Sequence, residues 1–251
     1  MKQITKKPKI HKNGFPPKEI SFHTIATRVA PENVAQLHEW YERHNTYVMV
    51  MERPTQSIDL FELSKKYGAL DESSVKRIMY QLVTTVLKLR TAGIVHHDIK
   101  DENILINMET FQIKLIDFGC AKNYSTDVVS HFITLFGSVF MFEQVFNVFS
   151  VQQKRFSGTP EFFPPEWFHS KRYEQDKMTV WQMGCLFYIL LTGKPPFRAA
   201  KDIQSAEWVA HRPILRHLRR YTYSLLVSML APSHDDRVGI EDILKHPYWT
   251  T

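Results

Sequence analysis

A polar segment near the middle of the chain carries the residues best suited to chemistry. It reads His96-His97-Asp98-Ile99-Lys100-Asp101-Glu102-Asn103, and Asp117-Phe118-Gly119 begins fourteen residues after Asn103. Transfer of a phosphoryl group from ATP needs a carboxylate that accepts the hydrogen bond of the attacking hydroxyl, a cation beside the moving phosphate, and oxygen ligands for Mg²⁺. The segment contains all three kinds of group, so the sequence predicts a phosphoryl-transfer site here.

Each of these roles can be given to a side chain by its type. Asp98 can accept the hydroxyl, Lys100 can offset the phosphate charge, and Asn103 and Asp117 offer the oxygen atoms that Mg²⁺ prefers. We expect Gly119 to free the backbone so that Asp117 can turn toward the metal. An isolated Asp-Phe-Gly would fit a solvated turn equally well, but the joint spacing favours catalytic roles for Asp98, Lys100 and Asn103.

The elements before this segment read as a strand and an amphipathic helix. Residues 47–51 are apolar and bounded by turn residues, which is typical of a short strand. Asp71 or Ser73 can cap the helix that follows, and Gly93 suits the left-handed residue that ends it. Apolar residues recur on one face of that helix: Val75, Ile78, Met79, Leu82, Val83, Val86 and Leu87.

The elements after the segment are two strands and then helices. We expect strands at 104–106 and 113–116, with a turn between them, and an apolar helix at 179–191 that Gly193 ends. The last third of the chain reads as short helices. A small strand-bearing start therefore precedes a mostly helical remainder, which predicts an α+β fold.

Composition narrows the class of protein. The 251 residues are 43% hydrophobic with a net charge of +6, and the basic residues are mostly dispersed, so we expect no nucleic-acid partner. Cys120 and Cys185 have no metal-ligand spacing, and the apolar run at 180–191 is shorter than the roughly 20 residues that span a bilayer. We expect a monomer without a membrane partner, located in the cytoplasm or the nucleus.

The segment from His96 to Asn103 resembles the catalytic loop of protein kinases, and Asp117-Phe118-Gly119 resembles their metal-binding turn. Pro164-Pro165-Glu166 is similar to the Ala-Pro-Glu element, whose glutamate would pair with Arg237. Thr159 could hydrogen-bond Asp98 and Lys100. The resemblance implies a bilobal kinase fold, ATP and Mg²⁺ as cofactors, and protein substrates. Lys100, two residues after Asp98, resembles serine/threonine kinases more than tyrosine kinases.

A narrower resemblance is to the PIM family of serine/threonine kinases. Glu52-Arg53-Pro54 resembles the hinge of that family, and Asp59-Leu60-Phe61 is similar to the string after it, which implies that Glu52 and Asp59 lie at the nucleotide site. Thr179 stands where most kinases carry an aspartate, and PIM kinases also lack this acid. The implied substrates carry basic residues, which Asp59, Asp101 and Glu102 could receive.

The sequence departs from the kinase pattern at its start. No glycine-rich loop precedes His96. The resemblance implies that Lys2 is the phosphate-binding lysine and Glu19, in a helix at 17–29, its ion-pair partner; a solvated terminal lysine is the alternative. We therefore expect a kinase domain over residues 1–251, truncated at the N-terminus, with an incomplete small lobe at 1–52 and a large lobe at 53–251.

A second departure is the stretch at 129–150, which has six Phe and one charged residue, Glu143, where a polar activation loop is expected. It reads as an atypical insert, either a hydrophobic docking or autoinhibitory segment or, like the missing loop, a gene-model or splicing artefact. A third departure is His97, which replaces the usual arginine. Histidine is only partly charged near pH 7, so we predict activity that is independent of loop phosphorylation.

Three functions remain open at this point. The first is an ATP-dependent protein serine/threonine kinase. The second is a catalytically impaired kinase-like scaffold or truncated product that binds without transferring phosphate. The third is a small-molecule phosphotransferase, against which the Glu166–Arg237 pair and Thr159 argue.

Overall fold

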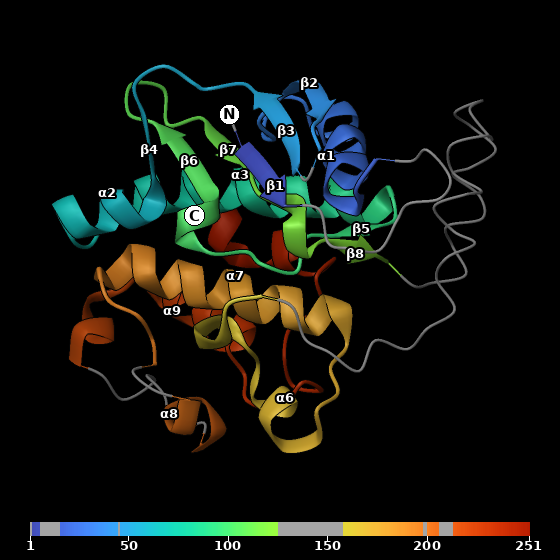
Figure 1. The fold of residues 1–251 in the computed structure, drawn as a ribbon. Helices are drawn as coiled ribbons and strands as arrows, with labels where there is room; N and C mark the ends of the chain where they lie inside the picture. The colour runs from blue at the N-terminus through green and yellow to red at the C-terminus, as the bar shows by residue number, and fades with distance from the viewer. Residues whose placement is uncertain (1, 6–15, 45, 125–157, 198–199, 206–212) are drawn as a thin grey trace.

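The computed structural model describes residues 2–5, 16–44, 46–124, 158–197, 200–205 and 213–251 (Figure 1). The apolar stretch at 129–150, interpreted above as an insert, lies outside the described residues. So does the side chain of Lys2, although its backbone is described.

The first part of the chain forms an antiparallel sheet of three described strands, in the order β1-β3-β2. These are β1 (Lys2–Thr5), β2 (Leu37–Glu42) and β3 (Thr46–Met51), and helix α1 (Lys18–Val29) lies beside them (Figure 1). A small apolar cluster of Ile20, Tyr47 and Met49 joins α1 to the central strand. The strand predicted at 47–51 is confirmed, one residue longer than expected.

Short antiparallel ladders surround the polar segment. β4 (Ser57–Asp59), β6 (Ile104–Asn107) and β7 (Ile113–Leu115) form one sheet, and β5 (Ile94–Val95) pairs with β8 (Lys122–Asn123) in another. The segment from His96 to Asn103 therefore leaves β5 and enters β6. Because the strands at both of its ends are hydrogen-bonded to neighbouring strands, the backbone of the segment is anchored at each end.

Two long helices form the centre of the large lobe. α3 (Glu72–Thr91) begins at Asp71, whose carboxylate accepts the amides of Ser73 and Ser74, and Gly93 beyond its end has a left-handed φ of 76°. α7 (Gln175–Thr192) ends at Gly193, with φ 67°. A Cβ at Gly193 would meet the backbone of Gly68 and Ala69 at 2.8 Å. The predicted caps and ends are confirmed, although α7 begins four residues earlier than expected.

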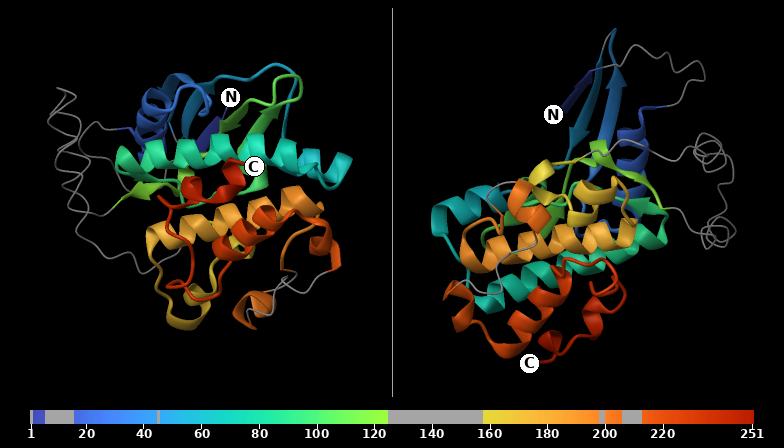
Figure 2. Two further views of the ribbon diagram at one scale, coloured as in Figure 1. Left: turned by 180° about the vertical axis from the view of Figure 1, so that it is seen from behind. Right: turned by 90° about the horizontal axis from the view of Figure 1, so that it is seen from below.

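The other α-helices among the described residues are short: α2 (Leu60–Tyr67), α6 (Pro165–Ser170), α8 (Ala200–Ser205) and α9 (Arg220–Met229). Of these, α8 and α9 confirm the short helices predicted in the last third of the chain. Figure 2 shows α3 and α7 side by side, with α9 against α7. One large apolar core joins these helices to β6, β7 and the segment around Phe118. Within the described ranges, no helix combines the length and apolar character needed to cross a membrane.

Candidate active site

The carboxylate of Asp98 is the centre of a dense hydrogen-bond network. Its Oδ1 accepts the backbone amide of Thr159 at 2.9 Å and the hydroxyl of the same residue at 2.8 Å. Its Oδ2 accepts the Asn103 side-chain amide at 3.0 Å and lies 3.3 Å from Lys100 Nζ. The residue is only 8% exposed. These contacts confirm the predicted bonds of Thr159 and fix the orientation of a carboxylate that keeps a small opening to solvent.

Lys100 lies between three oxygen atoms of different residues. Its Nζ donates to Thr159 Oγ1 at 2.7 Å and lies 3.0 Å from a carboxylate oxygen of Glu102, in addition to its contact with Asp98. Burial is the largest single influence on its pKa and lowers it. The Glu102 hydrogen bond and the Asp98 charge together outweigh burial and raise the pKa above its ordinary value. The amine is therefore held positive.

His96 connects the polar segment to the strand that leads to Asp117. Its Nδ1 accepts the Asp98 amide at 3.3 Å, so the ring proton is on Nε2, which donates to the Ile116 carbonyl at 3.0 Å. Burial lowers the pKa of this ring, which favours the neutral form that both bonds require. Sequence reasoning assigned no role to His96 beyond its place in the segment that carries Asp98.

His97 has a left-handed backbone, with φ 67°, and a fully buried ring that packs edge-on against Tyr173 with centroids 5.6 Å apart. Burial above all, and then the positive charge of Lys122, lower its pKa to about 2. The expectation that His97 is partly charged near pH 7 is therefore wrong. The ring is neutral because it is packed among protein groups and not solvated.

The turn at Asp117 differs from the expectation in one respect. Asp117 itself adopts the left-handed conformation, with φ 65°, and its Oδ1 accepts the Gly119 amide at 3.1 Å. The prediction that Gly119 supplies the backbone freedom is wrong, because its φ is not positive. Its lack of a side chain matters instead: a Cβ there would meet Asp117 Oδ1 at 3.0 Å and Glu19 Oε2 at 3.4 Å.

The donor set of Asn103 and Asp117 fits a magnesium ion. Asn103 uses its amide nitrogen for both bonds to Asp98, at 2.8 and 3.0 Å, which leaves the amide oxygen as its atom for a metal. The Ile116 amide donates to the backbone carbonyl of Asn103 at 2.9 Å, so the residue that precedes Asp117 adjoins Asn103. Among the described residues, no three His, Cys, Asp or Glu side chains form a ready metal site. Two oxygen ligands supplemented by phosphates are typical of Mg²⁺.

The four other residues predicted at the nucleotide site, Glu52, Asp59, Lys2 and Glu19, lie in different parts of the fold. Glu52 accepts the Gln36 amide at 3.0 Å and pairs with Lys114 at 3.1 Å, so its carboxylate stabilises the protein framework. Asp59 caps α2 by accepting the Glu62 amide at 2.7 Å. The backbone of Lys2 pairs with that of Met49 in the small sheet. Glu19, predicted as the partner of Lys2, places its carboxylate beside the Asp117–Gly119 turn.

The Glu166–Arg237 ion pair is confirmed as a bidentate contact. Two guanidinium nitrogens of Arg237 each donate to one Glu166 oxygen at 2.9 Å, and the same guanidinium also donates to the carbonyls of Lys177 and Ala231. The Arg237 side chain is 0% exposed, and its guanidinium lies 4.9 Å from the ring centroid of Trp181. The pair therefore connects α6 to α7 and to the loop at 231–237.

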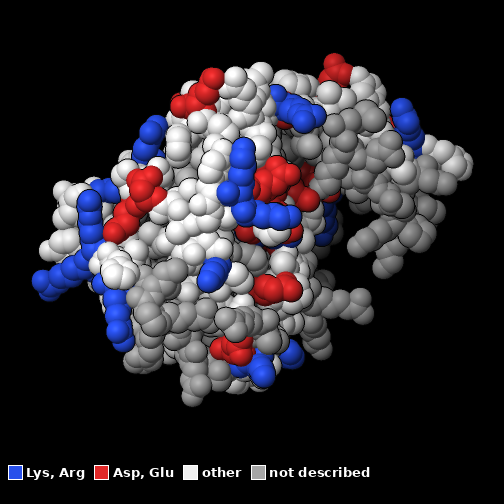
Figure 3. All heavy atoms as spheres, turned by 90° about the vertical axis from the view of Figure 1, so that its left-hand side faces the viewer, with Lys and Arg blue, Asp and Glu red and all other residues white. Residues whose placement is uncertain are grey.

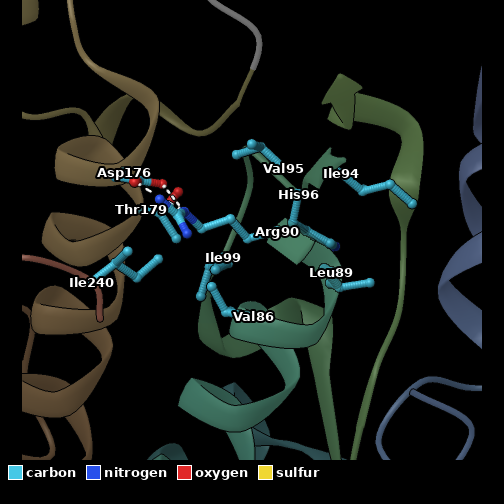
Figure 4. A pocket seen from close by; sticks show the side chains of 10 residues that line it. All are labelled: Val86, Leu89, Arg90, Ile94, Val95, His96, Ile99, Asp176, Thr179 and Ile240. Atoms are coloured by element: carbon cyan, nitrogen blue, oxygen red, sulfur yellow. Dashed lines mark hydrogen bonds and ion pairs between the residues drawn. The ribbon is translucent and has the colours of Figure 1, made fainter. Parts of the chain in front are cut away.

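A second charged cluster, which sequence reasoning missed, lies behind the polar segment. Arg90 Nε donates to both oxygens of Asp176, at 3.0 and 3.1 Å, and its Nη1 to Glu241 at 2.6 Å. Tyr124, just after β8, donates its hydroxyl to Asp176 at 2.7 Å and lies under the Arg90 guanidinium. Figure 4 shows Arg90 and Asp176 at the edge of a small cavity that His96 and Ile99 also line. The cluster joins the end of β8 to α7.

Comparisons with known proteins agree with this geometry. The sequence matches the family described as "Protein kinase domain" over residues 1–249. It is 34% identical over 216 residues to "Serine/threonine-protein kinase pim-2" of Danio rerio, which covers 86% of this chain and 61% of that protein. It is 31% identical over 232 residues to "Serine/threonine-protein kinase prk-2" of Caenorhabditis elegans (92% and 47%). A third relative is the "PAS domain-containing serine/threonine-protein kinase" of Mus musculus, 31% identical over 227 residues (90% and 14%).

The chain thus spans from 14% to 61% of the length of these three relatives. The family match covers nearly all of it, and the two-lobed α+β architecture and the network around Asp98 agree with that match. The chain belongs to the protein kinase domain family.

Proposed function

We propose that this chain transfers the terminal phosphoryl group of ATP to serine or threonine hydroxyls of protein substrates. The observation that carries the proposal is the cluster of Asp98, Lys100, Asn103 and Thr159, whose functional groups lie within 3.3 Å of one another along the network. Phosphoryl transfer depends mainly on positioning and on electrostatic stabilisation, and this cluster provides both.

Asp98 takes the role of the base. Its Oδ1 would exchange the Thr159 hydroxyl for the hydroxyl of the substrate. It would receive the proton of that hydroxyl as the substrate oxygen bonds to the terminal phosphorus and the bond from this phosphorus to the bridging oxygen breaks, which releases ADP. The Thr159 amide, 2.9 Å away, and Asn103 hold the carboxylate in one orientation during this exchange. Lys100 remains protonated and places its positive charge beside the Asp98 carboxylate. There it can offset the negative charge that develops on the transferred phosphate.

Asn103 and Asp117 are the residues that would hold magnesium. When bound, the ion supplies charge that stabilises the phosphate oxygens of the nucleotide. The chain's own contribution is the fixed relation between the two ligands. The backbone carbonyl of Asn103 accepts a hydrogen bond from the Ile116 amide, and the Asp117 carboxylate accepts one from the Gly119 amide. Glu19 adds an acidic group beside this turn, contributed by α1.

Serine and threonine are proposed over tyrosine because the position of Lys100, two residues after Asp98, resembles serine/threonine kinases more than tyrosine kinases. The three relatives described above are all named as serine/threonine kinases, which supports the same choice. Within that class we propose a PIM-like kinase. The support is the string Glu52-Arg53-Pro54, in which Pro54 has no amide to donate to an adenine base, and the similarity to pim-2.

We further propose that basic residues of the substrate bind near Asp101. Burial above all raises the pKa of Asp101, and the nearby charges of Glu102 and Asp59 raise it further, so Asp101 lies in a locally negative field. A substrate arginine would relieve this repulsion. Figure 3 shows the side of the molecule from which α2 projects in Figure 1. Acidic side chains gather near the middle of this face, and basic side chains lie beside them.

The test of the main proposal is phosphate transfer from ATP·Mg²⁺ to an arginine-rich serine peptide by the chain, beside Asp98→Asn and a control, Asp235→Asn. Loss of the base should slow transfer by about 10²- to 10⁴-fold. The control changes a surface carboxylate that pairs only with the adjacent His234 in the structure, so it should transfer like the original chain. Transfer that is equal in all three proteins would contradict the proposal.

A folded chain that binds no Mg²⁺–nucleotide and transfers nothing would instead favour a kinase-like scaffold. Substrate preference has its own readout, a peptide series in which upstream arginines become alanine. Loss of transfer along that series supports the site near Asp101, and an unchanged rate argues against it.

A further inference from the structure

Gln182, in the middle of α7, contacts the backbone on both sides of Asp98. Its side chain is 0% exposed. Its Nε2 donates to the carbonyl of His97 at 3.0 Å, and its Oε1 accepts the amide of Ile99 at 3.4 Å. We propose that Gln182 is a positioning residue: it holds the peptide units that flank Asp98 and thereby aims the carboxylate at the substrate hydroxyl.

The backbone around Asp98 needs such support. His97 has a φ of 67°, a conformation that costs energy for a residue other than glycine and persists only where surrounding contacts impose it. The segment is also buried, so its peptide groups must find partners inside the protein. His96 binds the amide of Asp98, and Gln182 binds the groups on either side of that amide.

The chemistry of the side chain explains why a glutamine is present. The His97 carbonyl needs a donor and the Ile99 amide needs an acceptor, and a carboxamide supplies both from one planar group. A carboxylate could serve only the Ile99 amide, and an apolar side chain neither group. Thr179, also buried in α7, does not take this role, because its hydroxyl donates to the Gln175 carbonyl of its own helix at 2.8 Å.

The neighbouring side chain shows that α7 separates two tasks. Trp181 stacks on Phe197, with ring centroids 5.4 Å apart, and packs against the Arg237 guanidinium, so it stabilises the lower part of the lobe. Gln182, the next residue, instead contacts the loop that carries Asp98. A polar residue in a helix whose residues from Met178 to Thr192 are all buried is otherwise unfavourable, which supports a specific role.

The inference rests on the proposed kinase function, so its test has two readouts, one of which needs no activity. The variants are Gln182→Met, which keeps length and loses both bonds, and Gln182→Glu, which keeps an acceptor for Ile99 and loses the donor to His97. The control is Thr179→Val, which removes a buried hydroxyl of the same helix that does not reach the loop.

The first readout is amide hydrogen exchange at residues 97–99, with the amides of α3 as the internal reference. Loss of the bond to Ile99 should speed its exchange by about tenfold in Gln182→Met, with a smaller effect in Gln182→Glu and none in Thr179→Val. The second readout is steady-state transfer. For Gln182→Met, kcat should fall by about 10- to 100-fold, while KM for ATP stays close to that of the original chain because the residue does not contact the nucleotide site.

The outcomes separate the two proposals. Faster exchange confined to residues 97–99, with a lower kcat, supports both. The same exchange pattern in a chain that shows no transfer at all supports the positioning role of Gln182 and contradicts the kinase proposal. Unchanged exchange and unchanged kcat in Gln182→Met would overturn the positioning role. If Gln182→Met does not fold, the same measurements are made on Gln182→Glu. Faster amide exchange throughout α3 in Gln182→Glu would overturn the proposal as well.

Discussion

The loop that carries Asp98 and the small sheet β1-β3-β2 are held together in opposite ways. In the loop, side chains bind almost every polar group around Asp98, and the carboxylate itself has four partners. In the small sheet, stability comes from backbone ladders and three buried side chains, while Trp40 and Tyr41 on β2 are 39% and 50% exposed. The geometry around Asp98 is therefore set by residues of the large lobe.

This difference has a consequence for substitutions. A change in the large lobe removes a contact that other contacts depend on, so it should affect the whole fold or the rate of transfer. A change in the small sheet should act locally, because the buried cluster that its described side chains form with α1 is small. The variants below test this contrast, from the largest expected effect to the smallest.

The Arg237→Leu substitution should produce the largest loss of stability. It leaves the Glu166 carboxylate and three backbone carbonyls without their buried donor, so the free energy of unfolding should fall by about 3–5 kcal/mol. Urea unfolding measures this value. The control is Lys245→Leu, which breaks an exposed pair with Asp242 and should leave the free energy of unfolding nearly unchanged. Equal losses in the two variants would show that the buried pair contributes no special stability.

Met49→Ala in β3 tests the small sheet directly. Met49 is fully buried between α1 and the neighbouring strands, and its truncation should cost about 2 kcal/mol, at the low end for buried methionines because the cluster is small. Hydrogen exchange should show faster exchange in β2 and β3 with unchanged protection in α3 and α7. Equal loss of protection in α7 would contradict the local character of the small sheet.

Local sequence patterns predicted the helices and strands. They did not predict contacts between residues that are distant in the chain. The spacing of apolar residues located α3, and Gly93 and Gly193 marked helix ends because a left-handed residue is needed there. The start of α7 was missed because its first turn is polar and carries no apolar period. The family strings gave Asp98, Lys100, Asn103 and Thr159, whose contacts the structure contains.

The features that sequence reasoning missed all depend on burial or on long-range contacts. Gln182 meets Ile99 across 83 positions of the chain, and Arg90 meets Asp176 across 86. The left-handed residue was expected at Gly119 but is Asp117, because the surrounding contacts, and not the residue type, impose that conformation. The neutral state of His97 likewise follows from its burial, which one sequence does not reveal.

Acidification should destabilise the loop through its two buried histidines. The pKa of His97 is about 2 in the folded protein, and that of His96 is also lowered, whereas both rings titrate near 6.5 when unfolded. The unfolded chain therefore binds more protons, so the stabilisation is present above pH 6.5 and is lost as the pH falls. The His97 ring should cost about 1.4 kcal/mol per pH unit below 6.5, and His96 should add to the loss in the same direction.

Urea unfolding between pH 7.5 and 5.5 measures this slope for the original chain and for His97→Leu, which should reduce it by about 1.4 kcal/mol per pH unit. His38→Asn on β2 is the control, because that ring is exposed before and after unfolding. An unchanged slope in His97→Leu would show that the ring is solvated in the folded protein.

The smallest expected effect is that of phosphatase treatment on phosphate transfer, which should leave the rate unchanged. A neutral ring packed against Tyr173 cannot pair with a phosphate as a guanidinium would, and Lys122 already donates to the Tyr173 hydroxyl at 3.0 Å. Transfer before and after treatment, with phosphate removal verified by mass spectrometry, measures the effect. His97→Arg is the informative comparison, because it would restore a cation at this position. Activity that treatment abolishes in the original chain would mean that another cation organises the loop, and the geometry around Asp98 would then not be set within the large lobe alone.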